Sequence, residues 1–131
     1  MADVAAGALG QVLQDELKPN YLADCHSDNL TLLDEVLFMG MSLGAEVFQR
    51  QSVALRDRPD SAATLATITC PTLVLCGEED QLCPPDLHRE MVSAIPAATL
   101  EIISSCGHLS TMEQPDQVSA ALGRWLVHNK E

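Results

Sequence analysis

The amino-acid sequence predicts an α/β fold, in which a helical segment over residues 1–58 precedes a β-α-β-α unit over residues 59–131. Two observations predict it. Before residue 58 the apolar residues recur at helical spacing, whereas after it two short apolar runs alternate with helical stretches. Strands separated by single helices lie parallel in one sheet and are joined by a right-handed crossover. We therefore expect two parallel strands.

The composition is that of one ordinary domain with an aliphatic core. The chain has 131 residues, of which 47% are hydrophobic but only 3% aromatic, and its net charge is −12. An acidic protein repels phosphate backbones and anionic lipid, so nucleic acid and membrane surfaces are excluded as expected partners. No apolar run approaches the roughly 20 residues of a membrane span.

The cysteines and the N-terminus indicate a cytoplasmic protein. The five cysteines are an odd number and include no C-x-x-C pair, which is typical of reduced thiols. The first residues lack the basic and long apolar segments of a secretory signal. No ligand-like spacing of cysteine and histidine indicates a metal site, and no motif indicates a cofactor.

The first half is expected to form two helices. Residues 3–17 carry a helical stripe that should end at Pro19. Residues 30–56 predict a longer helix, because apolar residues follow i, i+3, i+4 steps along two adjacent stripes without a break in phase. Two adjacent stripes predict a helix with a broad buried face.

The second half is expected to supply both strands. Residues 71–77, PTLVLCG, are a continuous apolar run typical of a strand buried on both faces. A helix should begin near Pro85, because proline pre-sets φ for a first helical turn. Residues 98–103, ATLEII, predict the second strand, and Pro115 should open the last helix.

A carboxylate and an imidazole follow the two predicted strands. Asp80 comes just after the first strand and His108 just after the second. The carboxyl ends of neighbouring parallel strands meet at one edge of a sheet, where open α/β sheets place their sites. A carboxylate beside an imidazole fixes its tautomer and stabilises the imidazolium formed when it takes a proton. The two residues are therefore predicted to act as an acid–base pair.

Several short motifs around this pair resemble those of a known family. They are TLVLCG, GEED followed by PP, LEII, the GH after it, MEQP, and a helix ending in RWL. Together they make residues 60–127 resemble the C-terminal portion of an α/β-hydrolase. The resemblance implies a partial α/β-hydrolase fold with Asp80 as triad acid, His108 as triad base and Glu113 bracing the histidine loop. It also implies that the residues before Arg56 are lid helices.

Ser42 lies in a G-x-S-x-G pattern, GMSLG, which is typical of a nucleophile elbow. The chain order Ser42, Asp80, His108 fits that family. Three observations count against Ser42 as a nucleophile. Residues 57–71 cannot hold a further strand and its crossover, the helical stripes pass through the motif, and no earlier strand supplies a second oxyanion donor. We therefore interpret Ser42 as a helix residue, while the elbow interpretation stays open.

Four other side chains receive structural interpretations. Cys106, two residues before His108, is expected to be a small buried filler rather than a nucleophile. His26, Glu78 and Glu79 are expected to be solvated, because each lies in a polar stretch.

These observations favour the C-terminal part of a serine hydrolase acting on an ester or similar bond, inactive without a nucleophile. A small-molecule substrate is expected only when the site is completed. One alternative is a non-catalytic module, because an open sheet edge invites pairing with a second copy or with a chain that supplies the missing strands. Two others are a complete small hydrolase that uses Ser42 and a truncated reading frame with no role of its own.

Overall fold

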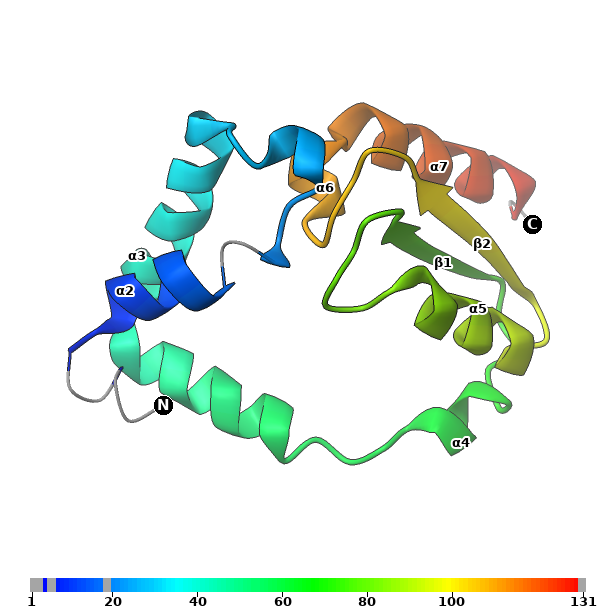
Figure 1. Cartoon of the computed structure of the whole chain (residues 1–131). Coiled ribbons are helices and arrows are strands. Elements are labelled where there is room, and N and C mark those ends of the chain that lie inside the picture. The colour runs from blue at the N-terminus through cyan, green and yellow to red at the C-terminus, as the bar shows by residue number, and fades with distance from the viewer. Residues whose placement is uncertain (1–3, 5–6, 18–19, 130–131) are drawn as a thin grey trace.

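A computed structural model describes residue 4, residues 7–17 and residues 20–129. The helical segment contains α2 (Leu9–Val12), a π-helical turn (Leu13–Leu17), a 3₁₀ turn (Asp24–His26) and α3 (Leu30–Arg56). There follow α4 (Ala62–Leu65), β1 (Thr72–Gly77), α5 (Pro85–Ala94), β2 (Ala98–Ile103), α6 (Ser110–Glu113) and α7 (Pro115–His128). Figure 1 shows α2 and α3 to one side of the sheet and its helices. The predicted α/β fold is confirmed.

The sheet has two parallel strands, as predicted, and the register pairs Thr72 with Ala98 through to Gly77 with Ile103. Helix α5 connects the strands, and α5 and α7 both pack against them. At its two ends β1 donates from Thr72 N to Ala97 O (3.2 Å) and from Glu78 N to Ile103 O (2.8 Å). Alternate residues of a parallel strand bond to the same neighbour. The N–H groups of odd-numbered β1 residues therefore point to the other edge, where no described strand pairs.

Two hydrophobic clusters form the core of the described chain. One joins α2 and the π-helical turn to one side of α3, and it consists of Val4, Leu9, Val12 and Leu13 with the partly buried Leu37, Ala45 and Phe48. The other joins β2 to α7, and it consists of Ile103, Cys106 and Val118 with the partly buried Leu75. The clusters lie on opposite sides of the division proposed at residue 58, which itself stays a prediction.

Two predictions for α3 are wrong. None of its residues is buried, although a broad buried face was expected. Its helical phase also breaks at Gly44, where φ is 79° and ψ is 168°, a conformation that glycine adopts without a Cβ clash. The burial prediction failed because α3 meets the first cluster only through Leu37, Ala45 and Phe48, which are themselves partly buried. Phe38 and Leu55 are 65% and 69% exposed.

Other expectations compare more simply with the structure. Pro19, expected to end the first helix, lies outside the described residues. Val74 and Cys76 of β1 are buried, whereas Leu73 and Leu75 are half-buried, so β1 is covered less completely than predicted. None of the helices in the described part of the chain has the length and apolar character needed to cross a membrane.

Candidate active site

Asp80 and His108 meet beyond the carboxyl ends of the two strands. The Nδ1 atom of His108 lies 2.9 Å from Oδ2 and 3.1 Å from Oδ1 of Asp80. Asp80 is only 6% exposed, while the His108 side chain is 34% exposed. Because an ionised carboxylate only accepts hydrogen bonds, Nδ1 is the donor and Nε2 is left unprotonated in the neutral ring. The structure thus brings together the two residues that the strand order predicted to be neighbours.

The Asp80 carboxylate is held by the turn that follows it. Its Oδ1 atom accepts hydrogen bonds from the backbone N–H groups of Leu82 and Cys83, each at 2.9 Å. Such a turn is typical of aspartate, whose side chain bonds to its own backbone two residues ahead. The carboxylate is therefore oriented toward His108 by local geometry that needs no substrate.

Two glycines allow close backbone contacts around the Asp80–His108 pair. A Cβ at Gly77 would lie 2.1 Å from the carbonyl oxygen of Gly107 and 2.3 Å from that of Cys106. A Cβ at Gly107 would lie 2.6 Å from Ala23 N. The Glu79 N–H donates to Cys106 O at 2.8 Å across this contact. Only glycine fits at both positions: Gly77 lets the backbone before Asp80 contact the backbone before His108, and Gly107 lets the histidine loop contact residues 21–23.

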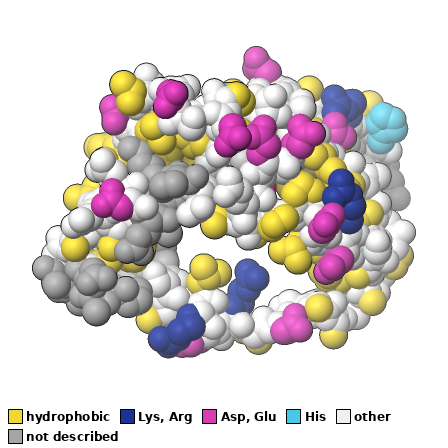
Figure 2. Space-filling model, in the orientation of Figure 1, with side chains coloured by type: hydrophobic (Ala, Val, Ile, Leu, Met, Phe, Trp, Pro, Cys, Tyr) yellow, Lys and Arg dark blue, Asp and Glu magenta, His cyan; other side chains and the backbone are white. Residues whose placement is uncertain are grey.

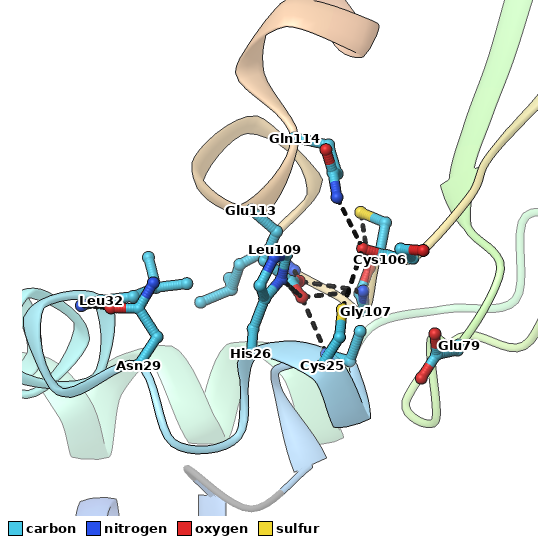
Figure 3. Close-up of polar contacts among 12 residues, drawn as sticks. Cys25, His26, Asn29, Leu32, Glu79, Cys106, Gly107, Leu109, Glu113 and Gln114 are labelled. Atoms are coloured by element: carbon cyan, nitrogen blue, oxygen red, sulfur yellow. Dashed lines mark hydrogen bonds and ion pairs between the residues drawn. The ribbon is translucent and has the colours of Figure 1, made fainter.

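Glu113 braces the histidine loop, as the family resemblance implied. Its side chain is fully buried, and its carboxylate accepts from the N–H groups on either side of His108, from Gly107 at 3.0 Å and Leu109 at 3.1 Å. It also accepts from Ala23 N at 2.8 Å and lies 3.2 Å from His26 Nδ1 (Figure 3). One carboxylate therefore ties the histidine loop to a segment almost 90 residues away in sequence.

That distant segment, residues 21–26, crosses both loops, and we call it the strap. The His108 N–H donates to Tyr21 O at 2.7 Å, and the two rings stack with centroids 6.2 Å apart. Asp24 N donates to Glu79 Oε2 at 2.9 Å. The expectation of solvated side chains is therefore wrong for His26 and Glu79, which hold the strap, although Glu78 is exposed. No sequence signal identified these contacts, because they join residues far apart in the chain.

A pocket of about 270 Å³ lies beside His108. The strap and the histidine loop supply Tyr21, His108 and Leu109, and the helical segment supplies the rest. Those remaining residues are Leu13, Val36, Leu37, Met39 and Gly40. The pocket therefore opens between the helical segment and the β-α-β-α unit, next to the acid–base pair.

Ser42 does not line this pocket. It is an exposed residue of α3, two positions after the lining residue Gly40. Residues two apart on a helix point roughly 200° away from each other. None of the hydrogen bonds found among the described residues joins Ser42 to His108. Ser42 also sits within helix, whereas a nucleophile elbow is a turn from strand to helix.

Cys106 has the properties of a core residue. Its side chain is fully buried, and burial, followed by the charges of Glu113 and Asp80, raises the pKa of its thiol to about 12. Burial likewise raises the pKa of Cys76. The thiolate is the reactive form, so these two cysteines are inert fillers. Within the described ranges, no group of three or more His, Cys, Asp or Glu side chains is placed to hold a metal ion.

Comparison with known proteins agrees with this geometry. Residues 2–121 match a family model described as "Alpha/beta hydrolase family". A 2-hydroxy-6-oxononadienedioate/2-hydroxy-6-oxononatrienedioate hydrolase from Pseudomonas sp is 37% identical over 70 residues, which are 53% of this chain and 25% of the relative. A proline iminopeptidase from Lactobacillus helveticus is 34% identical over 67 residues, which are 51% of this chain and 22% of that relative.

The fold of this chain is also similar to that of a solved structure. A thermophilic esterase from Thermogutta terrifontis, solved with malate bound, superposes on 100% of this chain with a TM-score of 0.83 and 25% identity. The superposition covers 52% of the esterase. The chain thus spans about half of that structure and about a quarter of each of these two curated relatives.

Proposed function

Because this chain belongs to the alpha/beta hydrolase family, we propose that it supplies the acid and the base of a serine-hydrolase active site. Asp80 is the acid and His108 the base, and the bond cleaved is an ester or a similar bond. The observation that carries the proposal is the 2.9 Å hydrogen bond from His108 Nδ1 to a buried carboxylate, beside a pocket that His108 itself lines.

The proposed chemistry depends on which ring nitrogen of His108 carries no proton. Nε2 of His108 takes the proton of a nucleophilic hydroxyl and later gives it to the leaving group. Asp80 keeps the ring in the correct tautomer and stabilises the imidazolium between those two steps. Glu113 and the strap hold the imidazole in place, which reduces the reorganisation needed during the reaction.

The proposal assigns no nucleophile to this chain. Ser42 is exposed and lies off the pocket, and only α4 is found between α3 and β1 in the described part of the chain. The nucleophile of the completed site must therefore come from residues other than those described. We expect this chain alone to be inactive on esters. Hydrolysis of a short-chain activated ester that disappears in Ser42→Ala would contradict this expectation and revive the elbow interpretation.

Substituting Asp80→Asn is expected to move the His108 proton from Nδ1 to Nε2. An Asn side chain keeps the oxygen that accepts from Leu82 and Cys83, but its amide donates toward Nδ1. In a serine hydrolase the wrong tautomer lowers kcat by about 10⁴-fold. The measurement is the ¹⁵N chemical shifts of the His108 ring at neutral pH, which separate the two tautomers without any need for activity.

The control for that experiment is Asp86→Asn, which removes one carboxylate charge from an exposed position on α5. The His108 shifts should be unchanged in this variant. A wild-type protein whose His108 Nδ1 carries no proton, or an Asp80→Asn variant that keeps the wild-type shifts, would refute the acid–base pair.

A second candidate function is an interaction module that pairs with a second copy or with a chain that supplies further strands. Two observations favour it: the outer edge of β1 is unpaired among the described strands, and α3 exposes several large apolar side chains. Unpaired strand edges recruit further strands. Exposed apolar patches mark association sites. The exposed large apolar residues of α3 are Leu30, Phe38, Met39, Met41, Leu43, Val53 and Leu55.

This candidate predicts self-association that Leu73→Pro weakens. The Leu73 N–H points to the outer edge, so proline there removes an edge donor while it leaves the bonds between β1 and β2 in place. The measurement is light scattering over a range of concentrations, with circular dichroism to check the fold. A folded wild-type monomer at every concentration would rule out pairing with a second copy.

A further inference from the structure

We propose that the pocket beside His108 takes an uncharged, apolar group of the substrate and discriminates against carboxylates. This inference rests on the proposed function, because it concerns the same site, and it names the class of substrate that the site accepts. Three observations carry it: the residues that line the pocket, the positions of the positive charges, and the size of the pocket.

The lining of the pocket is aliphatic apart from two rings. Of the described side chains that line it, only Tyr21 and His108 are polar, and the others are hydrophobic or glycine. Burial raises the pKa of Tyr21 above its usual range, so its phenol stays neutral near pH 7. His108 faces the Asp80 carboxylate, which offsets any positive charge that the ring acquires. The described residues of the pocket therefore offer an anion no uncompensated cation.

The described arginines lie outside the pocket, and most of them pair with carboxylates. Four of them pair with carboxylates, and the pairs are Arg50–Glu46, Arg56–Asp57, Arg89–Asp86 and Arg124–Glu101. None of the described arginines, Arg58 included, lines the pocket. The net charge of the chain is −12, and Figure 2 shows carboxylates spread over the visible face with basic side chains at a few places. A carboxylate that entered this pocket would lose water and gain no cationic partner among the described arginines.

The volume sets the size of the group. An apolar cavity of about 150 Å³ holds one benzene molecule. A pocket of about 270 Å³ therefore accommodates a benzene-sized ring with a short chain, or a branched aliphatic group of similar size. The contrast with the 37% identical relative is chemical, because the name of that protein describes a dienedioate, which is a dicarboxylate. We infer that the part of the substrate bound by this chain differs from such a compound in charge.

The test uses two probes of similar shape, neutral 4-fluorotoluene and anionic 4-fluorobenzoate, with ¹⁹F NMR titration of the full chain at pH 7. The neutral probe is expected to bind at least tenfold more tightly. Met39→Arg adds a cation to the pocket lining, so it should weaken binding of the neutral probe and tighten binding of the benzoate about tenfold. Met41→Arg makes the same change two residues along α3, off the pocket, and should leave both affinities as in the wild type.

Three outcomes would overturn the inference: benzoate binding at least as tightly as fluorotoluene to the wild type, binding of neither probe, or equal effects of the two arginine variants. Circular dichroism shows whether each variant is folded. The His108 tautomer is read in a separate experiment, so a failure of the pocket inference leaves the acid–base proposal intact. An incorrect His108 tautomer with neutral-probe selectivity retained would refute the acid–base proposal and leave the pocket inference standing.

Discussion

Replacing Glu113 by alanine is expected to lower the free energy of unfolding by roughly 3–5 kcal/mol. The fully buried carboxylate accepts from the backbone N–H groups of Ala23, Gly107 and Leu109 and contacts His26. Alanine would leave three backbone donors without this acceptor, and each buried donor left unsatisfied costs about 1–3 kcal/mol. The contact between the strap and the histidine loop would loosen, because the hydrogen bond from His108 N to Tyr21 O would be left to join them without this carboxylate.

The measurement is urea unfolding, with Glu78→Ala as the matched control. Glu78 is exposed, and its removal should change stability by less than about 0.5 kcal/mol. Glu113→Gln keeps one carbonyl oxygen as an acceptor and should fall between the two. If Glu113→Ala were as stable as Glu78→Ala, Glu113 would not be the group that ties the strap to the loop.

The elements after residue 71 were predictable because their signals are local. A continuous apolar run, a proline at a helix start and an alternation of strand and helix are all visible within a few residues of sequence. The strand predicted over residues 98–103 matches β2 as found, and Pro115 opens α7 as expected. The proximity of Asp80 and His108 then followed from a rule of topology, since parallel neighbours end at the same edge.

The strap could not be predicted, because nothing in its sequence marks its partners. Ala23 and Glu113 are 90 residues apart, and Asp24 and Glu79 are 55 apart. From sequence alone a carboxylate is predicted to lie at the surface, because the donors that satisfy a buried carboxylate are not visible in the sequence. Polar side chains in a loop are therefore predicted to be solvated, and this prediction is wrong for His26 and Glu79.

The burial of α3 could not be predicted for a different reason. An apolar stripe shows which side chains favour burial, but it does not show whether anything is present to cover them. On α3 some apolar side chains, such as Leu37 and Phe48, meet the first cluster, whereas others, such as Phe38 and Leu55, are exposed. Gly44 adds a further limit, because a glycine inside a helical pattern is compatible with both a continuous helix and a break.

Substituting Gly77→Ala is expected to cost roughly 3 kcal/mol or more and to break the Asp80–His108 hydrogen bond. The new methyl group would lie 2.1 Å from Gly107 O and 2.3 Å from Cys106 O, and backbone atoms cannot rotate away as a side chain can. The end of β1 and the histidine loop would have to separate. Asp80 follows the end of β1, and His108 lies in the histidine loop. The distance between the two side chains would therefore increase even where the two strands stay hydrogen-bonded.

The matched control is Gly123→Ala on α7, where the added Cβ would meet no described atom within 4 Å beyond its chain neighbours and the backbone of its own helix. Alanine in a helix interior is favoured over glycine by roughly 1 kcal/mol, so this variant should be more stable than the wild type. Urea unfolding measures both variants, and the downfield ¹H resonance of His108 Nδ1–H reports the hydrogen bond. That resonance should vanish in Gly77→Ala and persist in Gly123→Ala. If Gly77→Ala kept both wild-type stability and the resonance, the close contact of the two loops would not be what positions the pair. Asp80 and His108 would then have to be aligned by the Leu82–Cys83 turn and Glu113 alone.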